Sequence, residues 1–322
     1  MYGFRIFVRT VLLGVLLSVA VCVASAREVV KIAFYNVENF YDTIPDPAGG
    51  DTEYLPGGTR NWDTERYSAK LTNIARVLDE LDADVAGLAE IENETAVRDL
   101  VMTLRTDYNY IYLSGGDSRG MSLAVLYKGD KFVPDTARLV GIASSRKALY
   151  VRGELYGERV DVIVCHMPSQ MNAARYRDRG LASLYGYVEY LHGHDRDARI
   201  ILVGDFNADP ADRIMKRRFH TAEVAVDGRR PLFAPLSQLA AHGVGSYVYN
   251  NRWLLYDNIF LSTRFLGGDG FRYLDSGIFL RPWMLDNETV SRKGYPFRTF
   301  AGGVYLGGYS DHLPVFVLLV RD

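Results

Sequence analysis

The segment Ile200-Ile201-Leu202-Val203-Gly204-Asp205-Phe206-Asn207 decides the fold, because a short apolar run in it stops abruptly at polar residues. Its length and its β-branched residues predict a buried strand over 199–203. The same pattern, an apolar strand that ends in a carboxylate, an amide or a histidine, recurs along the chain. Residues 85–89 lead into Glu90, and residues 160–165 lead into His166. Near the end of the chain, Ser310-Asp311-His312-Leu313-Pro314 precedes the last apolar run.

The rest of the chain alternates short β-rich runs with helical ones, which predicts one α/β or α+β domain over 27–322. The clearest helix is predicted over 63–81, where apolar residues recur at helical spacing. Further helices are expected over 95–104 and 173–191. Strands are expected over 29–35, 84–90, 121–127, 149–155, 160–165, 199–203, 256–261 and 315–320. Residues 42–62 form a predicted long loop, and 211–246 and 264–309 are expected to be loop-rich.

The composition is that of a soluble globular protein, with 322 residues of which 48% are hydrophobic and 24% charged. These fractions exclude a disordered, collagen-like or multi-span membrane chain. The formal charge of −2 provides no overall basic field for holding polyanions, which weighs against a tight, non-specific DNA binder. It remains compatible with an enzyme that holds phosphate through a few local groups and a metal.

Residues 1–26 have the pattern of a secretory signal peptide. Arg5 and Arg9 precede an apolar run over 11–23, and Ala24-Ser25-Ala26 is a small-residue cleavage site before Arg27. A membrane anchor is the alternative, but the apolar run is shorter than the roughly 20 residues that span a bilayer. A lipid attached to Cys22 is disfavoured because bulky Val21 precedes it. We therefore expect an exported protein, periplasmic or secreted, with Cys165 as its single thiol and no disulfide within the chain.

Each polar strand end has an ordinary structural interpretation when it is considered alone. An acid such as Glu90 or Asp205 commonly serves as a turn residue or a helix cap. A histidine at a strand end is commonly a hydrogen-bonded surface residue. Asn36 could cap a loop, and Asp257, which lies inside an apolar run, must find a partner or face solvent.

Taken together, these acids, histidines and asparagines predict a metal site built from oxygen ligands, with acid–base groups beside it. Carboxylates and amides suit Mg²⁺ or Mn²⁺, whereas Zn²⁺ favours histidine and cysteine. The sequence contains no CxxC, HExxH or P-loop pattern, so zinc proteases and NTP hydrolases find no support. Metal-assisted hydrolysis of a phosphoester is the chemistry that remains.

Seven motifs follow one another in an order that resembles the endonuclease/exonuclease/phosphatase superfamily, which is deoxyribonuclease I-like. They are Asn36-Val37-Glu38-Asn39-Phe40, Gly87-Leu88-Ala89-Glu90-Ile91-Glu92-Asn93, Ser118-Arg119-Gly120, His166-Met167-Pro168-Ser169, Gly204-Asp205-Phe206-Asn207, Tyr256-Asp257-Asn258 and Ser310-Asp311-His312. The likeness is greatest to secreted bacterial members and spans about residues 29–320. It implies a four-layer sandwich, in which two mixed β-sheets pack face to face with helices on both outer faces.

The resemblance also implies a role for each motif residue. Glu90 resembles the principal metal-binding carboxylate, with Asn36 beside it and Asp311 as a further acid of the metal site. Asp257 and His312 resemble an Asp–His pair, and Asp205 and Asn207 resemble the pair beside the attacking water and the phosphate. His166 resembles a phosphate-contacting histidine, and Arg119 is a candidate phosphate contact or a solvated turn residue. The proton of the attacking water would go to His312 or to Asp205.

The chain departs from its relatives around the histidine at 166. Cys165 stands where many relatives have asparagine, and Met167 and Gln170 replace the tryptophan and arginine of a His-Trp-Pro-Ser-Arg pattern. These changes leave the histidine in place but remove a bidentate phosphate donor and an aromatic platform. They bear on the substrate more than on the chemistry.

These patterns predict an exported, Mg²⁺-dependent phosphoesterase, with a nuclease that cuts within the strand as the leading hypothesis. Candidate nucleic-acid contacts, each of which could equally be solvated surface, are Lys216-Arg217-Arg218, Arg229-Arg230, Arg252, Trp253, Arg281 and Trp283. The alternative is the same chemistry on a phospholipid headgroup or a small phosphate ester, as in sphingomyelinases and inositol phosphatases. A binding protein without turnover is a lesser alternative, and stable membrane insertion is not expected. The sequence says nothing about oligomeric state.

Overall fold

Strand β1 (Glu28–Phe40) shows how the layers of the fold arise, because its successive side chains point to opposite faces. Ala33 and Tyr35 belong to an apolar cluster that includes helix residues. Ile32 and Phe34 belong to another cluster, which consists mainly of strand residues from the two large sheets. Both faces of this strand are therefore buried, as in a central strand of a layered domain.

The computed structural model describes residues 27–47, 49–117, 119–143, 146–221 and 231–322. The predicted signal peptide, Ser118 and Arg229-Arg230 lie outside the described residues.

Two six-stranded sheets form the centre of the molecule. The first has the order β13 (Arg272–Ile278), β16 (Val315–Arg321), β1, β2 (Val85–Ile91), β4 (Ser122–Tyr127) and β3 (Asn109–Tyr112). The second has the order β5 (Phe132–Gly141), β6 (Lys147–Leu155), β7 (Glu158–His166), β8 (Ile200–Asp205), β12 (Asp257–Ser262) and β9 (Leu232–Phe233). Each sheet contains one parallel pair, β1 with β2 and β7 with β8, among antiparallel neighbours, so both sheets are mixed.

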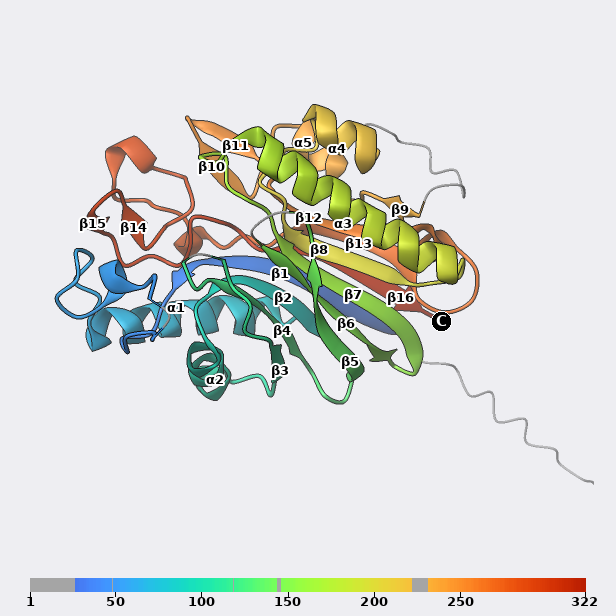
Figure 1. Ribbon diagram of the computed structural model, residues 1–322, viewed down its shortest axis with the longest axis horizontal. Helices are drawn as coiled ribbons and strands as arrows, with labels where there is room; N and C mark the ends of the chain where they lie inside the picture. The colour runs from blue at the N-terminus through green and yellow to red at the C-terminus, as the bar shows by residue number, and fades with distance from the viewer. Residues whose placement is uncertain (1–26, 48, 118, 144–145, 222–230) are drawn as a thin grey trace, which may run out of the picture.

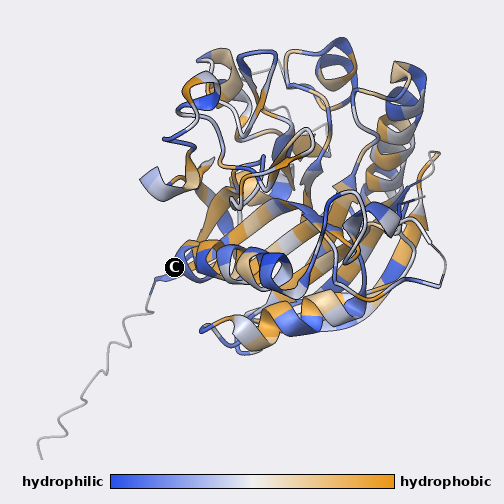
Figure 2. Cartoon of the chain, turned by 90° about the vertical axis from the view of Figure 1, so that its left-hand side faces the viewer, coloured by the Kyte–Doolittle hydropathy of each residue, from blue (hydrophilic) through white to orange (hydrophobic). Residues whose placement is uncertain are grey.

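Helices cover the outer faces of both sheets (Figure 1). Helices α1 (Thr64–Leu81) and α2 (Glu94–Thr103) pack on the first sheet, and α3 (Ala174–His194) and α4 (Arg213–Arg218) pack on the second. Figure 2 shows that the strands are rich in apolar residues and that the surface helices carry both polar and apolar positions. The predicted four-layer sandwich is confirmed.

The remaining elements are short. They are α5 (Ser237–Ala241), the hairpins β10 (Tyr247–Tyr249) with β11 (Arg252–Leu254) and β14 (Phe300–Ala301) with β15 (Val304–Tyr305), and the 3₁₀ turns Thr52–Tyr54, Thr263–Leu266, Pro282–Met284 and Val290–Arg292.

The three predicted helices are present, each within three residues of its expected ends, and the predicted strands are present too. Asp63 caps α1 by accepting a hydrogen bond from the backbone N–H of Arg66. Strand β1 is longer than the predicted 29–35, because it continues through a bulge as far as Phe40. The region 264–309 was expected to be loop-rich, but it contains the edge strand β13, whose polar composition hides its pairing with β16. Strands β3 and β5 were also missed.

Candidate active site

Three predicted site residues lie together at one end of the central strands of the second sheet. His166 ends β7, Asp205 ends β8 and Asp257 begins β12. Because β7 and β8 are parallel and β12 is antiparallel to β8, His166 pairs with Asp205 and Asp205 pairs with Asp257 in the strand register. Residues far apart in the sequence therefore lie side by side at one end of the sandwich.

The first sheet contributes Glu90 through a backbone irregularity. Glu90 has a φ of 66° inside β2, where the pairing with β1 shifts register. A non-glycine residue in this left-handed region is uncommon, and such conformations cluster at functional sites. The bulge also allows the backbone N–H of Asn39 to donate to the Glu90 carboxylate at 2.8 Å.

Asn36 joins the two sheets at the site. Its side-chain amide donates to Asp205 at 3.1 Å, and its side-chain oxygen accepts from the backbone N–H of Glu38. The Ser310 hydroxyl donates to the Asn36 backbone carbonyl, which ties the loop before β16 to β1. Asn36 is thus held between Asp205 and the loop that carries His312.

Asp257 and His312 form a hydrogen-bonded pair. The Nδ1 atom of His312 lies 2.7 Å from a carboxylate oxygen of Asp257, which is completely buried and also accepts from the Ser246 hydroxyl. The other ring nitrogen, Nε2, faces Asp205 at 3.9 Å. The ring of Tyr247 stacks on the His312 ring with their centroids 4.6 Å apart. The imidazole is therefore held on one edge and one face.

The electrostatics of the site separate its two histidines. Burial alone lowers the pKa of His312, but attraction to Asp257 and the hydrogen bond to it outweigh burial and raise this pKa to about 10. Burial, followed by the charges of Arg146 and Arg119, lowers the pKa of His166 well below its usual range. At neutral pH and without a cation, His312 is an imidazolium and His166 is neutral. Burial raises the pKa of Asp205 to about 7, although the charge of His312 opposes this change.

Two arginines and one aspartate form the wall beside Glu90. Asp117 accepts from Arg119 at 3.2 Å and from Arg146 at 2.9 Å. Arg119 also donates to the Asn39 side chain at 3.0 Å and lies 3.6 Å from Glu90. His166 lies 3.6 Å from Glu90 and 3.5 Å from Asp205. Arg119 is thus part of the site wall rather than an isolated turn residue.

A buried ion network lies behind Asp311. Arg298 donates to Asp311 at 2.7 Å and lies 3.4 Å from Glu38. Lys70, whose side chain is fully buried, lies 4.0 Å from Glu38 and donates to the Thr299 hydroxyl. One oxygen of Asp311 is therefore engaged by Arg298, while the other lies 3.9 Å from Nε2 of His312.

These residues surround a cavity of about 430 Å³. We call this space the catalytic cavity. The charged residues and histidines that line it are Glu90, Asp117, Arg119, Arg146, His166, Asp205, Asp311 and His312. Asn207 lines it as well, and its side chain donates to the Met167 carbonyl at 3.0 Å, which leaves a second N–H of the amide for a ligand. Acids, bases and cations thus face one space that can hold a phosphate group.

The donor set fits a hard divalent cation. Glu90 and Asp311 both offer carboxylate oxygens to the catalytic cavity, and oxygen ligands suit Mg²⁺ or Mn²⁺. Ligand atoms of Asp205, Asp257 and His312 also lie within 4.8 Å of one another. However, both the His312 ring and the Ser246 hydroxyl already bond to Asp257, and an imidazolium repels a cation.

Four residues of this region were not predicted from the sequence. They are Asp117, Arg146, Tyr247 and Arg298. Each lies in a segment without a recognisable motif and reaches the site only through the pairing of distant strands. A signal existed for Asp117 alone, because it lies two residues before Arg119.

The departures around His166 have unequal consequences. Cys165 and Met167 are completely buried in the apolar cluster between the second sheet and α3. Neither residue lines the catalytic cavity, and the prediction that these departures bear on the substrate stays a prediction. Gln170 does reach the site, since its side chain donates to the backbone carbonyl of Asn207 at 2.6 Å.

Two of the candidate nucleic-acid contacts also pack within the chain. Arg281 pairs with Glu80 at 3.1 Å, and the Trp283 ring lies 3.9 Å from the guanidinium of Arg76. Both partners belong to α1, so these side chains hold a loop against that helix. Lys216, Arg217 and Arg218 are exposed on α4.

A cavity lined by carboxylates, arginines and a histidine that is bonded to a buried aspartate is typical of a hydrolase of phosphate esters. A sequence profile of the Endonuclease/Exonuclease/phosphatase family matches residues 31–321, so the chain belongs to this family of metal-dependent phosphoester hydrolases. A search of curated proteins finds no significant match.

Solved structures share the fold at low sequence identity. An endonuclease/exonuclease/phosphatase family protein from Bacteroides thetaiotaomicron is 17% identical with a TM-score of 0.59, covering 92% of this chain and 96% of its own. A mannosyl-6-phosphatase from the same organism is 17% identical with a TM-score of 0.57, covering 90% and 99%. The catalytic domain of human Nocturnin is 15% identical with a TM-score of 0.57, covering 91% and 97%.

Among the helices of the described residues, none combines the length and the apolar character that a membrane span requires.

Proposed function

We propose that this protein is an exported, Mg²⁺-dependent phosphodiesterase that acts as a nuclease and cuts within the strand. The observation that carries the proposal is His312, which is bonded to the buried Asp257 and lines one cavity together with Glu90, His166 and Asp205. This arrangement places a proton-transfer group and a carboxylate site on two sides of the space for a phosphate. The intact pair also argues against a binding protein that has lost turnover.

The residues divide the reaction between them. His166, Asn207 and Arg119 are placed to donate hydrogen bonds to phosphate oxygens. Asp257 holds the His312 ring in one orientation, so that Nε2 points into the cavity toward Asp205. Of these two facing groups, Asp205 can accept the proton of the attacking water as a carboxylate, whereas His312 can accept it only in its neutral form. A divalent cation held by Glu90 and Asp311 would offset the charge of the phosphate oxygens.

Nucleic acid is the leading substrate because basic side chains continue beyond the catalytic cavity onto α4. Exposed lysine and arginine residues hold phosphate backbones by charge, without reading the base sequence. Although the formal net charge of the chain is −2, the exposed lysine and arginine residues of α4 form a local basic surface.

A second candidate function is hydrolysis of a phosphate monoester. It is favoured by Arg119 and Arg146, which bring two guanidinium groups to one wall of the cavity where the extra charge of a terminal phosphate could be held. One of the structures with this fold is described as a mannosyl-6-phosphatase.

The test incubates the purified protein with supercoiled plasmid, RNA, bis-p-nitrophenyl phosphate and p-nitrophenyl phosphate, with Mg²⁺ or with EDTA. Metal-dependent nicking of the plasmid is the expected result. The His312→Ala variant should lose it, whereas His194→Ala, which changes an exposed histidine on α3, should keep it. Turnover of the monoester alone would replace the proposal by the second candidate. Inactivity on every substrate would overturn both.

Export is tested separately by expressing the chain from Met1 and determining the N-terminus of the product. A protein that begins at Arg27 and lies outside the cytoplasm is expected. Retention of residues 1–26 by the mature protein would refute cleavage.

A further inference from the structure

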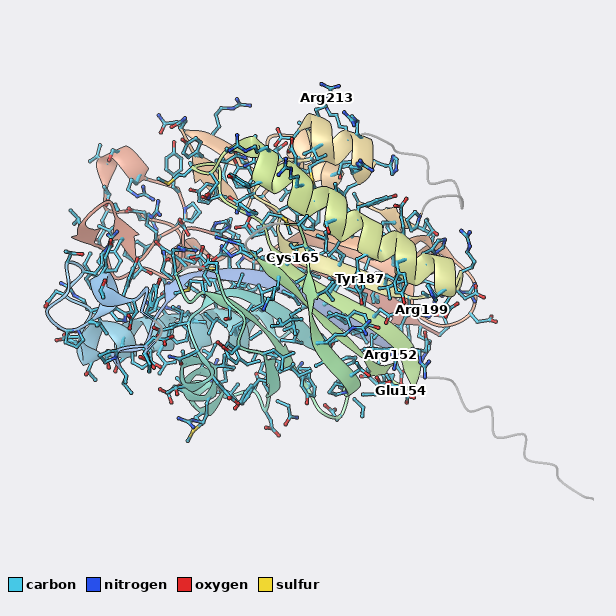
Figure 3. The ribbon with its side chains drawn as sticks, viewed as in Figure 1. Arg152, Glu154, Cys165, Tyr187, Arg199 and Arg213 are labelled. Atoms are coloured by element: carbon cyan, nitrogen blue, oxygen red, sulfur yellow. The ribbon has the colours of Figure 1, made fainter. Side chains whose placement is uncertain are left out.

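A second cavity of about 580 Å³ lies next to the catalytic cavity. Its lining contains Gln170, Arg177, Arg213, Arg217 and Tyr256. Arg177 belongs to α3, whereas Arg213 and Arg217 belong to α4, and these helices pack side by side (Figure 1). Figure 3 shows Arg213 at the outer surface of α4, so the cavity opens beneath a basic rim.

Two direct links join this second cavity to the catalytic groups. The Tyr256 ring stacks on Tyr247 with centroids 5.4 Å apart, and Tyr247 stacks on His312 at 4.6 Å. Gln170 lines the second cavity while its side chain donates to the Asn207 carbonyl at the catalytic cavity. The residues that line the two cavities are therefore in direct contact, and the cavities lie side by side.

Arg177 is the residue whose unpaired, buried N–H groups indicate a ligand site. Only 7% of this residue is exposed, and its Nε and Nη1 atoms are buried without a hydrogen-bond partner among the described residues. No carboxylate in the described part of the chain lies within ion-pair distance of its guanidinium. A buried cation without a partner is costly, and a charged acceptor removes that cost.

Asp212 interacts with Arg177 through its charge, but among the described residues no aspartate of the second cavity makes a hydrogen bond or an ion pair with this arginine. Asp209 accepts hydrogen bonds from the backbone N–H groups of Ala211 and Leu255. Asp212 accepts from the backbone N–H of Asp209. These two carboxylates are committed to holding their own loop, and Asp178, the third acid in the lining, is exposed on α3. Arg213 and Arg217 make no ion pair within the described residues, so they add positive charge at the rim.

We propose that the second cavity binds a second phosphate group of the substrate, on the same molecule as the phosphate that is cleaved. This inference rests on the proposed function and deepens it, because it makes substrates with two or more phosphates the preferred class. The second phosphate could be the next one along a nucleic-acid strand or the other phosphate of a small bisphosphate. In both cases Arg177 binds it from below, and Arg213 and Arg217 bind it from the rim.

Kinetics with matched substrates test the proposal. The p-nitrophenyl ester of thymidine 5′-phosphate has one phosphate, and its 3′-phosphorylated counterpart has two. We expect kcat/KM to be about tenfold higher for the second ester, because charge-assisted hydrogen bonds favour the molecule that makes them by roughly this factor or more. Equal values for the two esters and for an oligothymidylate would overturn the proposal.

Paired variants separate the cavity from general surface charge. Arg213→Ser with Arg217→Ser should abolish the preference, while bis-p-nitrophenyl phosphate is still hydrolysed at the normal rate. Lys216→Ser with Arg218→Ser removes the same charge from the same helix at positions outside the lining, and should keep the preference. An equal loss in both pairs would refute a specific site.

Arg177 is tested by the Arg177→Met and Arg177→Lys variants. Met should abolish the preference and Lys should restore part of it. If Arg177→Met fails to fold, the rim variants still decide the question. A preference seen only with the oligothymidylate would identify the second phosphate as that of a neighbouring nucleotide, whereas a preference seen also with the small ester would show that a bisphosphate suffices.

A binding measurement keeps the second site testable even without turnover. In calorimetry, thymidine 3′,5′-bisphosphate should bind about tenfold more tightly than thymidine 5′-monophosphate, and the Arg213/Arg217 pair of substitutions should remove this difference. If wild-type protein hydrolyses no ester but shows this difference, the proposed function fails and the second site stands. If it hydrolyses bis-p-nitrophenyl phosphate but shows no difference, only the second site fails.

Discussion

Replacing Asp257 by asparagine removes the charge that holds His312 protonated. The asparagine has nearly the same size, and its side-chain oxygen can still accept the Nδ1–H of His312 at the 2.7 Å observed. Because Asp257 is completely buried, no solvent takes over the role of the lost carboxylate. The substitution therefore changes the electrostatics of the pair and leaves its shape.

The size of the effect follows from the pKa of His312. The pKa of this group rises from 6.5 to about 10, mainly because attraction to Asp257 outweighs burial. At about 1.4 kcal/mol per pKa unit, the net shift corresponds to roughly 5 kcal/mol as an upper bound. Without the carboxylate, burial still lowers the pKa of His312 while the charges of Asp205 and Asp311 still raise it, so His312 should titrate clearly below the wild-type value of about 10 in Asp257→Asn. Activity should fall by roughly 10³–10⁴-fold, as expected when a histidine loses its orienting carboxylate.

The sign of the stability effect is also determined. A histidine whose pKa is raised by folding stabilises the protein fully below the unfolded pKa near 6.5, and this contribution is lost as the pH rises through about 10. The free energy of unfolding of Asp257→Asn should therefore fall short of the wild type most clearly below pH 6.5. The difference should narrow between pH 7 and pH 10.

The assay is a histidine NMR titration in EDTA, so that no cation adds its charge, combined with urea unfolding at several pH values. The chain has six histidines, and the signal that His312→Ala removes identifies the one of interest. Asp161→Asn is the matched control, since Asp161 is a buried aspartate bonded to Tyr150 away from the site. A His312 that titrates near 6.5 in the wild type, or near 10 in Asp257→Asn, would refute the reasoning.

Three further predictions follow from the same geometry. Glu90→Gln should weaken Mg²⁺ binding by calorimetry at least tenfold, and an unchanged titration would remove Glu90 from the metal site. In Asp79, burial opposes ionisation, but hydrogen bonds from the N–H groups of Thr106 and Arg105 outweigh it and lower the pKa. Asp79→Ala should thus lose about 2 kcal/mol of stability at pH 7, measured in urea, and a loss that persists below the folded pKa would contradict this cause. Cys165→Ala should keep full activity, because the buried thiol points into the core, and a large loss of kcat would contradict that placement.

The strand ends show how far local sequence patterns reach. The apolar runs before Glu90, His166 and Asp205 specified buried strands, and these strands are present. The strand register places His166 beside Asp205 and Asp205 beside Asp257. Apolar periodicity likewise located α1, because an amphipathic helix records its buried face in its own sequence.

Local patterns failed where pairing between distant segments decides the outcome. The polar edge strand β13 exists because β16 offers hydrogen-bonding groups, and no pattern within 272–278 records that partner. The bulge that turns Glu90 into the site depends in the same way on the pairing of β1 with β2. No local pattern records that the buried side chain of Cys165 lies in the apolar cluster with α3.

By itself, the sequence determined the superfamily, through that resemblance the layered fold, and seven of the fifteen residues that line the catalytic cavity, because the motifs are recorded in short runs of residue types. Only the tertiary structure decided that Arg146 and Asp117 complete the wall beside Glu90, and that Arg177 lies buried without a partner beneath α4. The reason is physical: burial and electrostatic environment are produced by contacts between segments more than a hundred residues apart in some cases, and such contacts leave no trace in local composition.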